Sequence, residues 1–325
     1  MEKMTIKETA QWLLEHDGYL ILTHKKPDGD AIGSAAALAA GLRQAGKRAY
    51  ICYNRDIGRK LEKYANEFWA PDDFVPETVV SVDLASLELL LDNMKPYGEN
   101  IALAIDHHMS NSKYCENLCL HAEMASCGEI IYEILLAMGV KIDKSIANAL
   151  YVAVSTDTGC FAYNNTKEGT LLTASKLVSA GAENGKINKE MFLTFSKSRL
   201  VLESLIVSNM EFYEDGKVAV GVITEEIMKK AGATDDDTDS IASLPSKIDG
   251  VRAGILMRQQ AEGGYKISLR TQSGINASEI CGKFGGGGHP AAAGCFIAKE
   301  FSKARGDIVE ATVRAVAAAE GAGKP

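Results

Sequence analysis

The sequence predicts an α/β protein, in which a doubly wound, mostly parallel sheet is joined by a helical linker to a smaller α/β domain. Short apolar runs alternate with stretches of helical periodicity through the first half of the chain, which is typical of a parallel sheet covered by helices. After about residue 210, strand-like runs follow one another more closely. The length of 325 residues suits two domains of ordinary size.

The first domain is expected to contain four strands with helices between them. The strands are expected at 19–23, 48–53, 77–82 and 101–105, and the helices at 5–14, 31–45, 87–94, 126–138, 144–156 and 171–180. The second domain is expected to contain strands at 218–223, 253–259 and 266–270, a helix at 225–231, and a glycine loop at 285–290 that is followed by the segment 291–296. The domain boundaries that follow are 1–185, a linker at 186–210, 211–318, and a flexible tail at 319–325.

Composition excludes several classes of protein. Hydrophobic residues make up 46% and charged residues 24%, no apolar run is long enough to cross a bilayer, and no signal peptide precedes the first helix. We therefore expect a cytoplasmic protein with no membrane partner. The net charge of −8 argues against non-specific binding to duplex DNA, although a metal and a few arginines could hold a small phosphorylated substrate. The seven cysteines include no Cys-x2-Cys pair, so we expect reduced thiols and no structural zinc.

Polar side chains follow three of the predicted strands at the point where each strand ends. His24 follows the first, Asp83 the third, and Asp106-His107-His108 the fourth. Because the carboxyl ends of parallel strands meet at one edge of a sheet, we expect these side chains to lie close together. One aspartate at a strand end is often only a cap, but three such ends favour a functional site.

The turn after the first strand and the end of the helix at 144–156 add further carboxylates. Asp28 and Asp30 flank Gly29, and Asp157 closes the helix; the alternative for Asp30 is that it only caps the next helix. Carboxylates and imidazoles without thiolates suit Mn²⁺, Mg²⁺, Co²⁺ or Zn²⁺. The candidate metal ligands are His24, Asp28, Asp30, Asp83, His107 and Asp157.

This set is too large for one catalytic ion that keeps an open position. We therefore expect two ions bridged by Asp83, which stands alone at its strand tip. Two such ions can lower the pKa of bound water and clamp a phosphate oxygen. Successive side chains project to opposite sides of a strand, so we expect at most one of His107 and His108 to bind a metal directly. The other would face the substrate or hold a ligand in place.

A glycine run and two arginines in the second domain suggest a site for a phosphate. Glycines at 285–288 allow backbone N–H groups to approach an anion, and His289 adds a donor; the alternative is a flexible loop. Arg258 and Arg270 each end a predicted strand and could fork onto a phosphate, the alternative being exposed surface residues. The fingerprint of dinucleotide-binding folds is absent after the first strand.

These motifs, in this order, resemble those of the DHH phosphoesterases. The four matching stretches are His24-x3-Asp28-Gly29-Asp30-x2-Gly33-Ser34, Asp83, Asp106-His107-His108 and Ser155-Thr156-Asp157-Thr158-Gly159. Ser268-Leu269-Arg270 with the glycine run and His289 looks like the DHHA1 domain, and the two-domain length is similar to the nanoRNase/pAp phosphatase branch. Cys127 stands before Gly128-Glu129 where threonine is common, and we expect it to fill the same small space.

The resemblance implies a manganese-dependent phosphoesterase that forms homodimers, with Mg²⁺, Co²⁺ or Zn²⁺ as alternative ions. His24, Asp28 and Asp83 would bind one ion, and Asp30, Asp83, His107 and Asp157 the other. His108 and Asp106 would serve catalysis, with His108 close to the reacting phosphate. The substrate would be bound by Arg258, Arg270, Gly286, Gly287, Gly288 and His289.

The expected substrates are short RNA and linear dinucleotides such as pApA, cleaved to mononucleotides, and pAp, converted to AMP. Membrane cyclic-di-AMP phosphodiesterases and RecJ-type exonucleases of the family carry additional segments, and family II pyrophosphatases lack the glycine-run domain. A stand-alone cyclic-di-AMP phosphodiesterase and a single-strand DNA exonuclease are alternatives. A nucleotide sensor without catalysis is a more remote one, because every metal position holds a competent residue.

Overall fold

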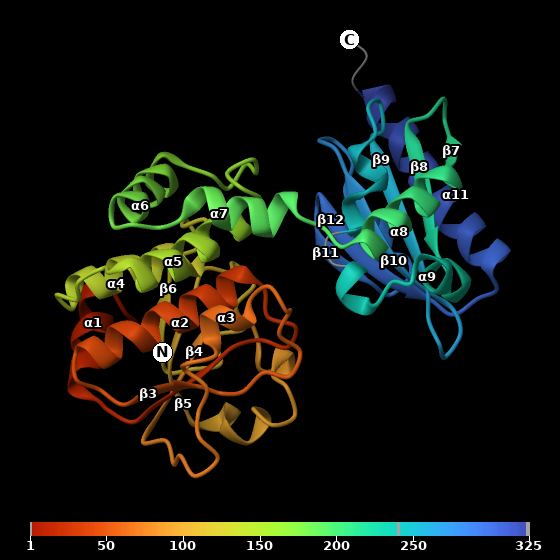
Figure 1. Cartoon of the computed structure of the whole chain (residues 1–325). Coiled ribbons are helices and arrows are strands. Elements are labelled where there is room, and N and C mark those ends of the chain that lie inside the picture. Colours follow the sequence, from red (N-terminus) through yellow and green to blue (C-terminus); the bar gives the residue numbers. More distant parts are fainter. Residues whose placement is uncertain (1, 239–240, 323–325) are drawn as a thin grey trace. The chain divides into compact units, whose positions relative to one another are not determined.

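The computed structural model describes residues 2–238 and 241–322 and confirms the predicted α/β class. The chain divides after Thr194 into two compact units, each built around its own six-stranded sheet (Figure 1). Within the described ranges, no helix has both the length and the apolar character needed to span a bilayer.

The sheet of the first unit is entirely parallel, in the order β1-β6-β5-β4-β2-β3. Its strands are β1 (Glu2–Lys3), β2 (Tyr19–Leu22), β3 (Ala49–Ile51), β4 (Thr78–Val82), β5 (Ile101–Asp106) and β6 (Asn117–Leu120). Its helices are α1 (Ile6–Glu15), α2 (Gly29–Gln44), α3 (Glu62–Ala65), α4 (Cys127–Ala137), α5 (Lys144–Asp157), α6 (Glu168–Ser179) and α7 (Asn184–Asn188). The chain runs from β2 to β3 and then returns to β4 on the other side of β2. The sheet therefore has its topological switch point between β2 and β4, where open α/β sheets bind ligands.

The two faces of this sheet are covered differently. Tyr19 and Ile21 of β2 pack with helices α1, α2, α4 and α5, whereas Leu20 and Leu22 face a second cluster. Residues 87–94, which we predicted to be helical, pack over that second face. The structure instead has 3₁₀ turns at Leu87–Leu89 and Lys95–Asn100, because the backbone becomes extended at Leu90 and interrupts the helical turn.

Glycines in α2 allow that helix to pack directly against α5. A Cβ atom at Gly33 would lie 2.3 Å from the Ala149 carbonyl oxygen, and one at Gly29 would lie 2.3 Å from Thr156 Oγ1. Neither glycine has a positive φ, so the absence of a side chain is what each position requires. This close approach brings the start of α2 next to Asp157 at the end of α5.

The sheet of the second unit is mixed, in the order β11-β12-β10-β9-β8-β7, and only the pair β8 and β9 is parallel. Its strands are β7 (Glu211–Tyr213), β8 (Val218–Ile223), β9 (Ala253–Gln259), β10 (Tyr265–Thr271), β11 (Gly287–His289) and β12 (Ala292–Ile297). Its helices are α8 (Lys197–Ser208), α9 (Glu225–Ala231), α10 (Ala277–Gly282) and α11 (Phe301–Ala322), with 3₁₀ turns at Asp235–Thr238, Ile241–Ser243 and Pro245–Lys247.

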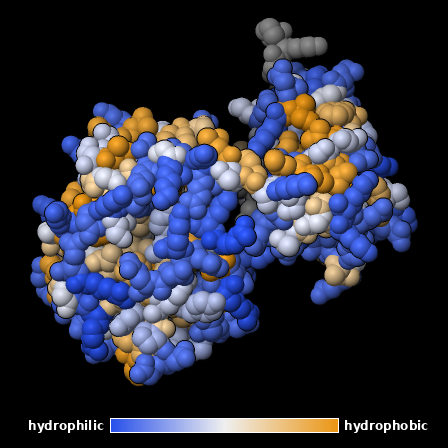
Figure 2. Space-filling model, viewed as in Figure 1, coloured by the Kyte–Doolittle hydropathy of each residue, from blue (hydrophilic) through white to orange (hydrophobic). Residues whose placement is uncertain are grey.

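The helices of this unit pack on opposite faces of its sheet. Residues of α10 and α11 join one core cluster, and residues of α8 and α9 join another. Figure 2 shows hydrophobic side chains gathered over α8, where Leu200 and Val207 are exposed.

Three predicted segments differ from the structure. Residues 186–210 are not one linker helix: α7 and a π-helical turn at Lys189–Leu193 end in extended backbone at Thr194, and Ser196 then caps α8. The expected tail is helical as far as Ala322, because its alanines favour helix and Ala319 packs against the core; residues 323–325 lie outside the described ranges. Part of the glycine loop forms strand β11, which pairs with β12.

Replacing Gly33 with alanine should destabilise the first unit by about 2 kcal/mol, because the new methyl group would meet backbone atoms of α5 that cannot move freely. Thermal or denaturant unfolding measures the loss. Gly169→Ala is the matched control, since that exposed helical glycine faces open space. An equal effect of the two substitutions would contradict the role given to close packing.

Candidate metal centre

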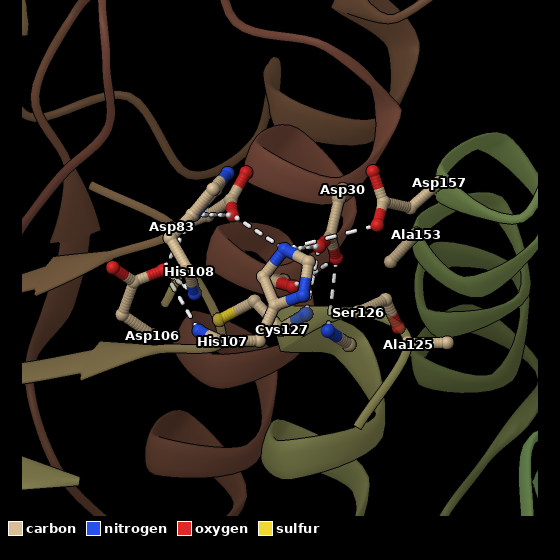
Figure 3. Close-up of polar contacts among 12 residues, drawn as sticks. Asp30, Asp83, Asp106, His107, His108, Ala125, Ser126, Cys127, Ala153 and Asp157 are labelled. Atoms are coloured by element: carbon tan, nitrogen blue, oxygen red, sulfur yellow. Dashed lines mark hydrogen bonds and ion pairs between the residues drawn. The ribbon is translucent and has the colours of Figure 1, made fainter. Parts of the chain in front are cut away.

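Seven polar side chains meet at the carboxyl edge of the first sheet, beside its switch point. They come from the segments that follow β2, β4 and β5, from the start of α2 and from the end of α5 (Figure 3). Their ligand atoms form three overlapping groups, in each of which all atoms lie within 4.8 Å of one another. The groups are His24, Asp28 and Asp83; Asp30, His107 and Asp157; and Asp83, His107 and His108.

Asp83 lies at the centre of this arrangement and belongs to two of the three groups. Its Oδ1 is 3.5 Å from both His107 Nε2 and His108 Nδ1, and its Oδ2 is 3.6 Å from His24 Nε2. The residue is buried, and its backbone has a φ of 53°. Aspartate is among the few residues that adopt this left-handed region, where strain often accompanies function.

Two buried atoms of the cluster have no hydrogen-bond partner among the described residues, namely Asp83 Oδ1 and His107 Nε2. His107 Nε2 lies 3.6 Å from Asp30 Oδ2 and 3.7 Å from Asp157 Oδ2, too far for good hydrogen bonds. Leaving buried polar atoms unpaired is costly, and a cation between these atoms would satisfy them. Carboxylates and imidazoles are ligands that divalent ions such as Mn²⁺, Mg²⁺ and Zn²⁺ accept. The residues present therefore fit a divalent metal.

Without metal, the cluster retains protons in place of cations. Burial and the charge of Asp83 raise the pKa of both Asp28 and Asp30, and burial raises the pKa of Asp157 to about 6. Burial alone would lower the pKa of His24 and His107. The neighbouring carboxylates outweigh this effect and raise the pKa to about 9 for His24 and about 10 for His107.

Each aspartate near the start of α2 caps a helix. Asp28 Oδ1 accepts hydrogen bonds from the backbone N–H groups of Asp30 and Ala31, both at 3.0 Å, so Asp28 caps α2. Asp30 instead accepts from the N–H groups of Cys127 at 2.7 Å and Gly128 at 2.9 Å, at the start of α4. The alternative that Asp30 caps its own helix is therefore wrong. The positive end of α4 helps to hold the buried Asp30 carboxylate.

Asp106 contacts the two histidines and the asparagine of its own loop. Its Oδ1 accepts hydrogen bonds from the backbone N–H groups of His107 and His108 and lies 2.8 Å from His108 Nδ1, while its Oδ2 accepts one from Asn111 at 2.6 Å. We predicted Asp106 as a catalytic residue; in the structure its contacts are with His107, His108 and Asn111, and its role stays a prediction.

The two histidines of this loop do not project to opposite sides as we predicted. Their ring centres are 4.5 Å apart, and both rings approach Asp83. The alternation of side chains that we assumed applies within a strand, and β5 ends at Asp106.

Sequence reasoning missed two buried asparagines that hold the strand ends. Asn111 Nδ2 donates to Asp106 and to the Leu84 carbonyl oxygen at 3.2 Å, so it joins the ends of β5 and β4. Asn54 Nδ2 donates to the His24 carbonyl oxygen at 2.9 Å. Both contacts join residues far apart in the sequence, and the only local signal was an asparagine shortly after a strand.

The residues predicted to bind substrate lie in the second unit. Arg270 and Gly287 line an open hollow of about 840 Å³. Gly286 and Gly288 lie against β12, where a Cβ would meet backbone oxygens at 2.2 and 2.6 Å, and His289 is exposed on β11. The prediction for Arg258 fits less well, because this side chain forms an ion pair with Asp235 and donates to Thr238 Oγ1.

Comparison with known proteins identifies both units. Residues 19–154 match the model of the DHH family N-terminal domain, and residues 215–318 match that of the DHHA1 domain. The chain is 28% identical to the probable bifunctional oligoribonuclease and PAP phosphatase NrnA of Streptococcus mutans, over 86% of this chain and 89% of that protein. It is 29% identical to the bifunctional oligoribonuclease and PAP phosphatase NrnA of Thermus thermophilus, over 90% and 88%.

A solved structure is similar over almost the whole length. An exopolyphosphatase-related protein from Bacteroides fragilis superposes with a TM-score of 0.87 at 26% identity, covering 97% of each chain.

Asn111→Asp should weaken binding of a divalent ion about 10- to 100-fold, the usual cost of losing a residue that orients ligands. The change removes the donor to Asp106 and places two carboxylates face to face. Calorimetric titration of the metal-free protein with Mn²⁺ measures it. Asn117→Asp, which loses a comparable donor to the Ala102 carbonyl oxygen away from the cluster, should bind the ion normally.

Metal binding at pH 7.5 should release at least two protons, because metals bind neutral imidazole and both His24 and His107 are protonated there without metal. Titrations in two buffers of different ionisation enthalpy give the number. The apparent affinity should also rise with pH between about 7 and 9. Binding without proton release would contradict the prediction, because it would show that the two imidazoles lose no protons when the metal binds.

Proposed function

Because the chain belongs to the DHH family and carries its DHHA1 domain as well, we propose that it hydrolyses phosphoesters of short nucleotides. The proposed reactions are cleavage of short oligoribonucleotides and of linear dinucleotides such as pApA to mononucleotides, and conversion of pAp to AMP. The chain is a phosphoesterase hydrolase by this membership. The single observation that carries the proposal is the pair of possible cation groups that share the buried carboxylate of Asp83. The names of the relatives support the choice of substrates.

The first ligand set that we propose is one group of the centre, and the second adds Asp83 to another group. His24, Asp28 and Asp83 hold one divalent ion. Asp30, His107 and Asp157 hold the other together with Asp83, whose Oδ1 lies 3.5 Å from His107 Nε2. Bound there, the ions would supply a water activated as nucleophile and positive charge for the phosphate oxygens. Mn²⁺ is the proposed ion, with Mg²⁺, Co²⁺ and Zn²⁺ as alternatives, since the same set of donors suits each of them.

His108 is placed to act on the reacting phosphate. Its Nδ1 is engaged by Asp106 at 2.8 Å, which leaves Nε2 for the substrate, and its side chain is 36% exposed against 12% for His107. The contact with Asp106 raises the pKa of His108, so that the ring is more often protonated near neutral pH. We assign Nε2–H the task of donating a hydrogen bond to a phosphate oxygen and a proton to the leaving oxygen.

In the second unit, Arg270 and the glycine strand β11 provide groups that suit the nucleotide and its terminal phosphate. Arg270 supplies a guanidinium fork for phosphate oxygens. Gly287 and the exposed His289 flank the same edge of the sheet. The homodimer that the family resemblance implies remains a prediction, to be checked by light scattering.

One purified preparation tests the proposal. The metal-free protein is supplied with Mn²⁺ and assayed against pApA, an RNA ladder, pAp, cyclic-di-AMP, short DNA and pyrophosphate. Turnover of pApA, short RNA and pAp supports the proposed function. Turnover of cyclic-di-AMP or of DNA alone would replace it by that alternative activity, and binding without turnover of any compound would indicate a sensor.

Asp83→Asn should lower kcat on pApA at least 100-fold, because the amide keeps the size of the side chain but cannot bridge two cations. Asparagine also tolerates the left-handed backbone of this position, so the thermal unfolding temperature should stay close to that of the parent. Steady-state kinetics with Mn²⁺ provides the measurement. Asp92→Asn, at an exposed aspartate of the same unit, should be fully active; a metal-loaded and active Asp83→Asn variant would refute the assignment.

A further inference from the structure

The hollow in the second unit lies on a part of its sheet that the described helices of this unit leave uncovered. Leu256 of β9 packs with α8 and α9. Ser268 of β10 and Gly294 of β12 are its register partners across the sheet and therefore lie on the same face. Both of these residues line the hollow. The helices thus cover the β8–β9 side of this face and leave its β10–β12 side open.

The open face has a floor of small residues and a cation at each end. Ser268, Ala292 and Gly294 form the floor, and Arg270 lies beside Ala292. Lys266 lies at the other end, four residues along β10, or about 13 Å away at the usual rise of a strand. This separation is too large for both cations to bind one phosphate, and it suits successive parts of an extended anionic ligand.

An exposed aromatic ring accompanies the second cation. Phe296 is the register partner of Lys266, lines the hollow and is 51% exposed. Its ring reaches Gly264 in the turn before β10, where a Cβ would lie 2.9 Å from Phe296 Cζ. The turn therefore holds the ring in place while half of the residue stays accessible. Glu262, on the same turn, is the one acidic residue among those that line the hollow.

Small residues, cations and an exposed aromatic side chain on an open sheet are the features with which proteins bind single-stranded nucleic acid. Bases stack on the aromatic ring, and the cations contact the phosphates. A free phosphate or a sugar phosphate would use Arg270 but would gain nothing from Phe296.

We propose that Phe296 and Lys266 form a second nucleotide subsite, at which a further base of a single-stranded oligonucleotide stacks on the Phe296 ring. The identity of the ligand as nucleic acid rests on the proposed function. A compound with one base, such as pAp, occupies only the end of the hollow near Arg270. Phe296 thereby sets the preference for oligonucleotides over pAp.

The test compares kcat/KM for a pentaribonucleotide with kcat/KM for pAp, with Mn²⁺ present. In Phe296→Ala the ratio of the two should fall about tenfold, mainly through KM for the pentaribonucleotide, since a stacked base contributes this much to binding. Phe296→Tyr should keep the ratio, and Phe296→Leu, which is apolar but has no ring, should not. Phe212→Ala is the matched control, because Phe212 is 50% exposed on β7 at the opposite edge of the same sheet.

An unchanged ratio in Phe296→Ala would overturn the proposal, and so would an equal loss on both substrates. If the parent protein hydrolyses neither compound, the proposed function fails, and the subsite is then tested by binding alone. Fluorescence anisotropy with a labelled pentaribonucleotide in EDTA should show about tenfold weaker binding for Phe296→Ala than for Phe212→Ala. Equal binding by the two variants would overturn the subsite.

Discussion

Three imidazoles converge on one buried carboxylate, and the first unit is arranged around that contact. Asp83 carries its charge in a place from which water is excluded, where burial by itself would raise its pKa. The close imidazoles of His107 and His24 outweigh burial and keep the pKa of Asp83 below its ordinary value. The same proximity raises the pKa of the two histidines. The centre is therefore a set of groups whose charges depend on one another. A pair of divalent cations would take the place of the protons that these groups hold together.

The fold serves this contact by bringing helix ends and strand ends to one edge. The glycines of α2 let it lie against α5, so that Asp30 and Asp157 reach the same imidazole. Asp30 in turn is held by the N-terminal N–H groups of α4. Asn111 is not itself a candidate ligand, but its side chain joins the ends of β4 and β5, which carry ligands. Most of these supports are backbone groups or short side chains, which have little freedom to move and so keep the ligand atoms in place.

The second unit uses glycine for a different purpose. Part of the glycine run forms the edge strand β11, the bare backbone of the run lies directly on β12, and the neighbouring floor is equally free of large side chains. A flat, open surface of this kind suits a ligand that is itself extended and flat, such as an unstacked nucleotide chain. Arg258, which the sequence suggested as a phosphate ligand, is instead held by Asp235, and only the fold could show that these two side chains meet.

The sequence by itself determined the class of fold, the strands that end at the centre and the seven residues that gather there, six of them as candidate metal ligands and His108 beside them. It could do so because strand ends and polar residues are local signals, and a parallel sheet converts their order into proximity. It did not determine which helix Asp30 caps, how His108 is oriented by Asp106 and Asn111, or that Phe296 lies on an uncovered face. The first and the last depend on contacts between segments distant in the chain, such as α2 with α4. The second depends on Asn111, which also joins the loop after β5 to the end of β4. Tertiary packing alone decides such contacts, because the energy of a hydrogen bond or a close approach depends on where both partners lie.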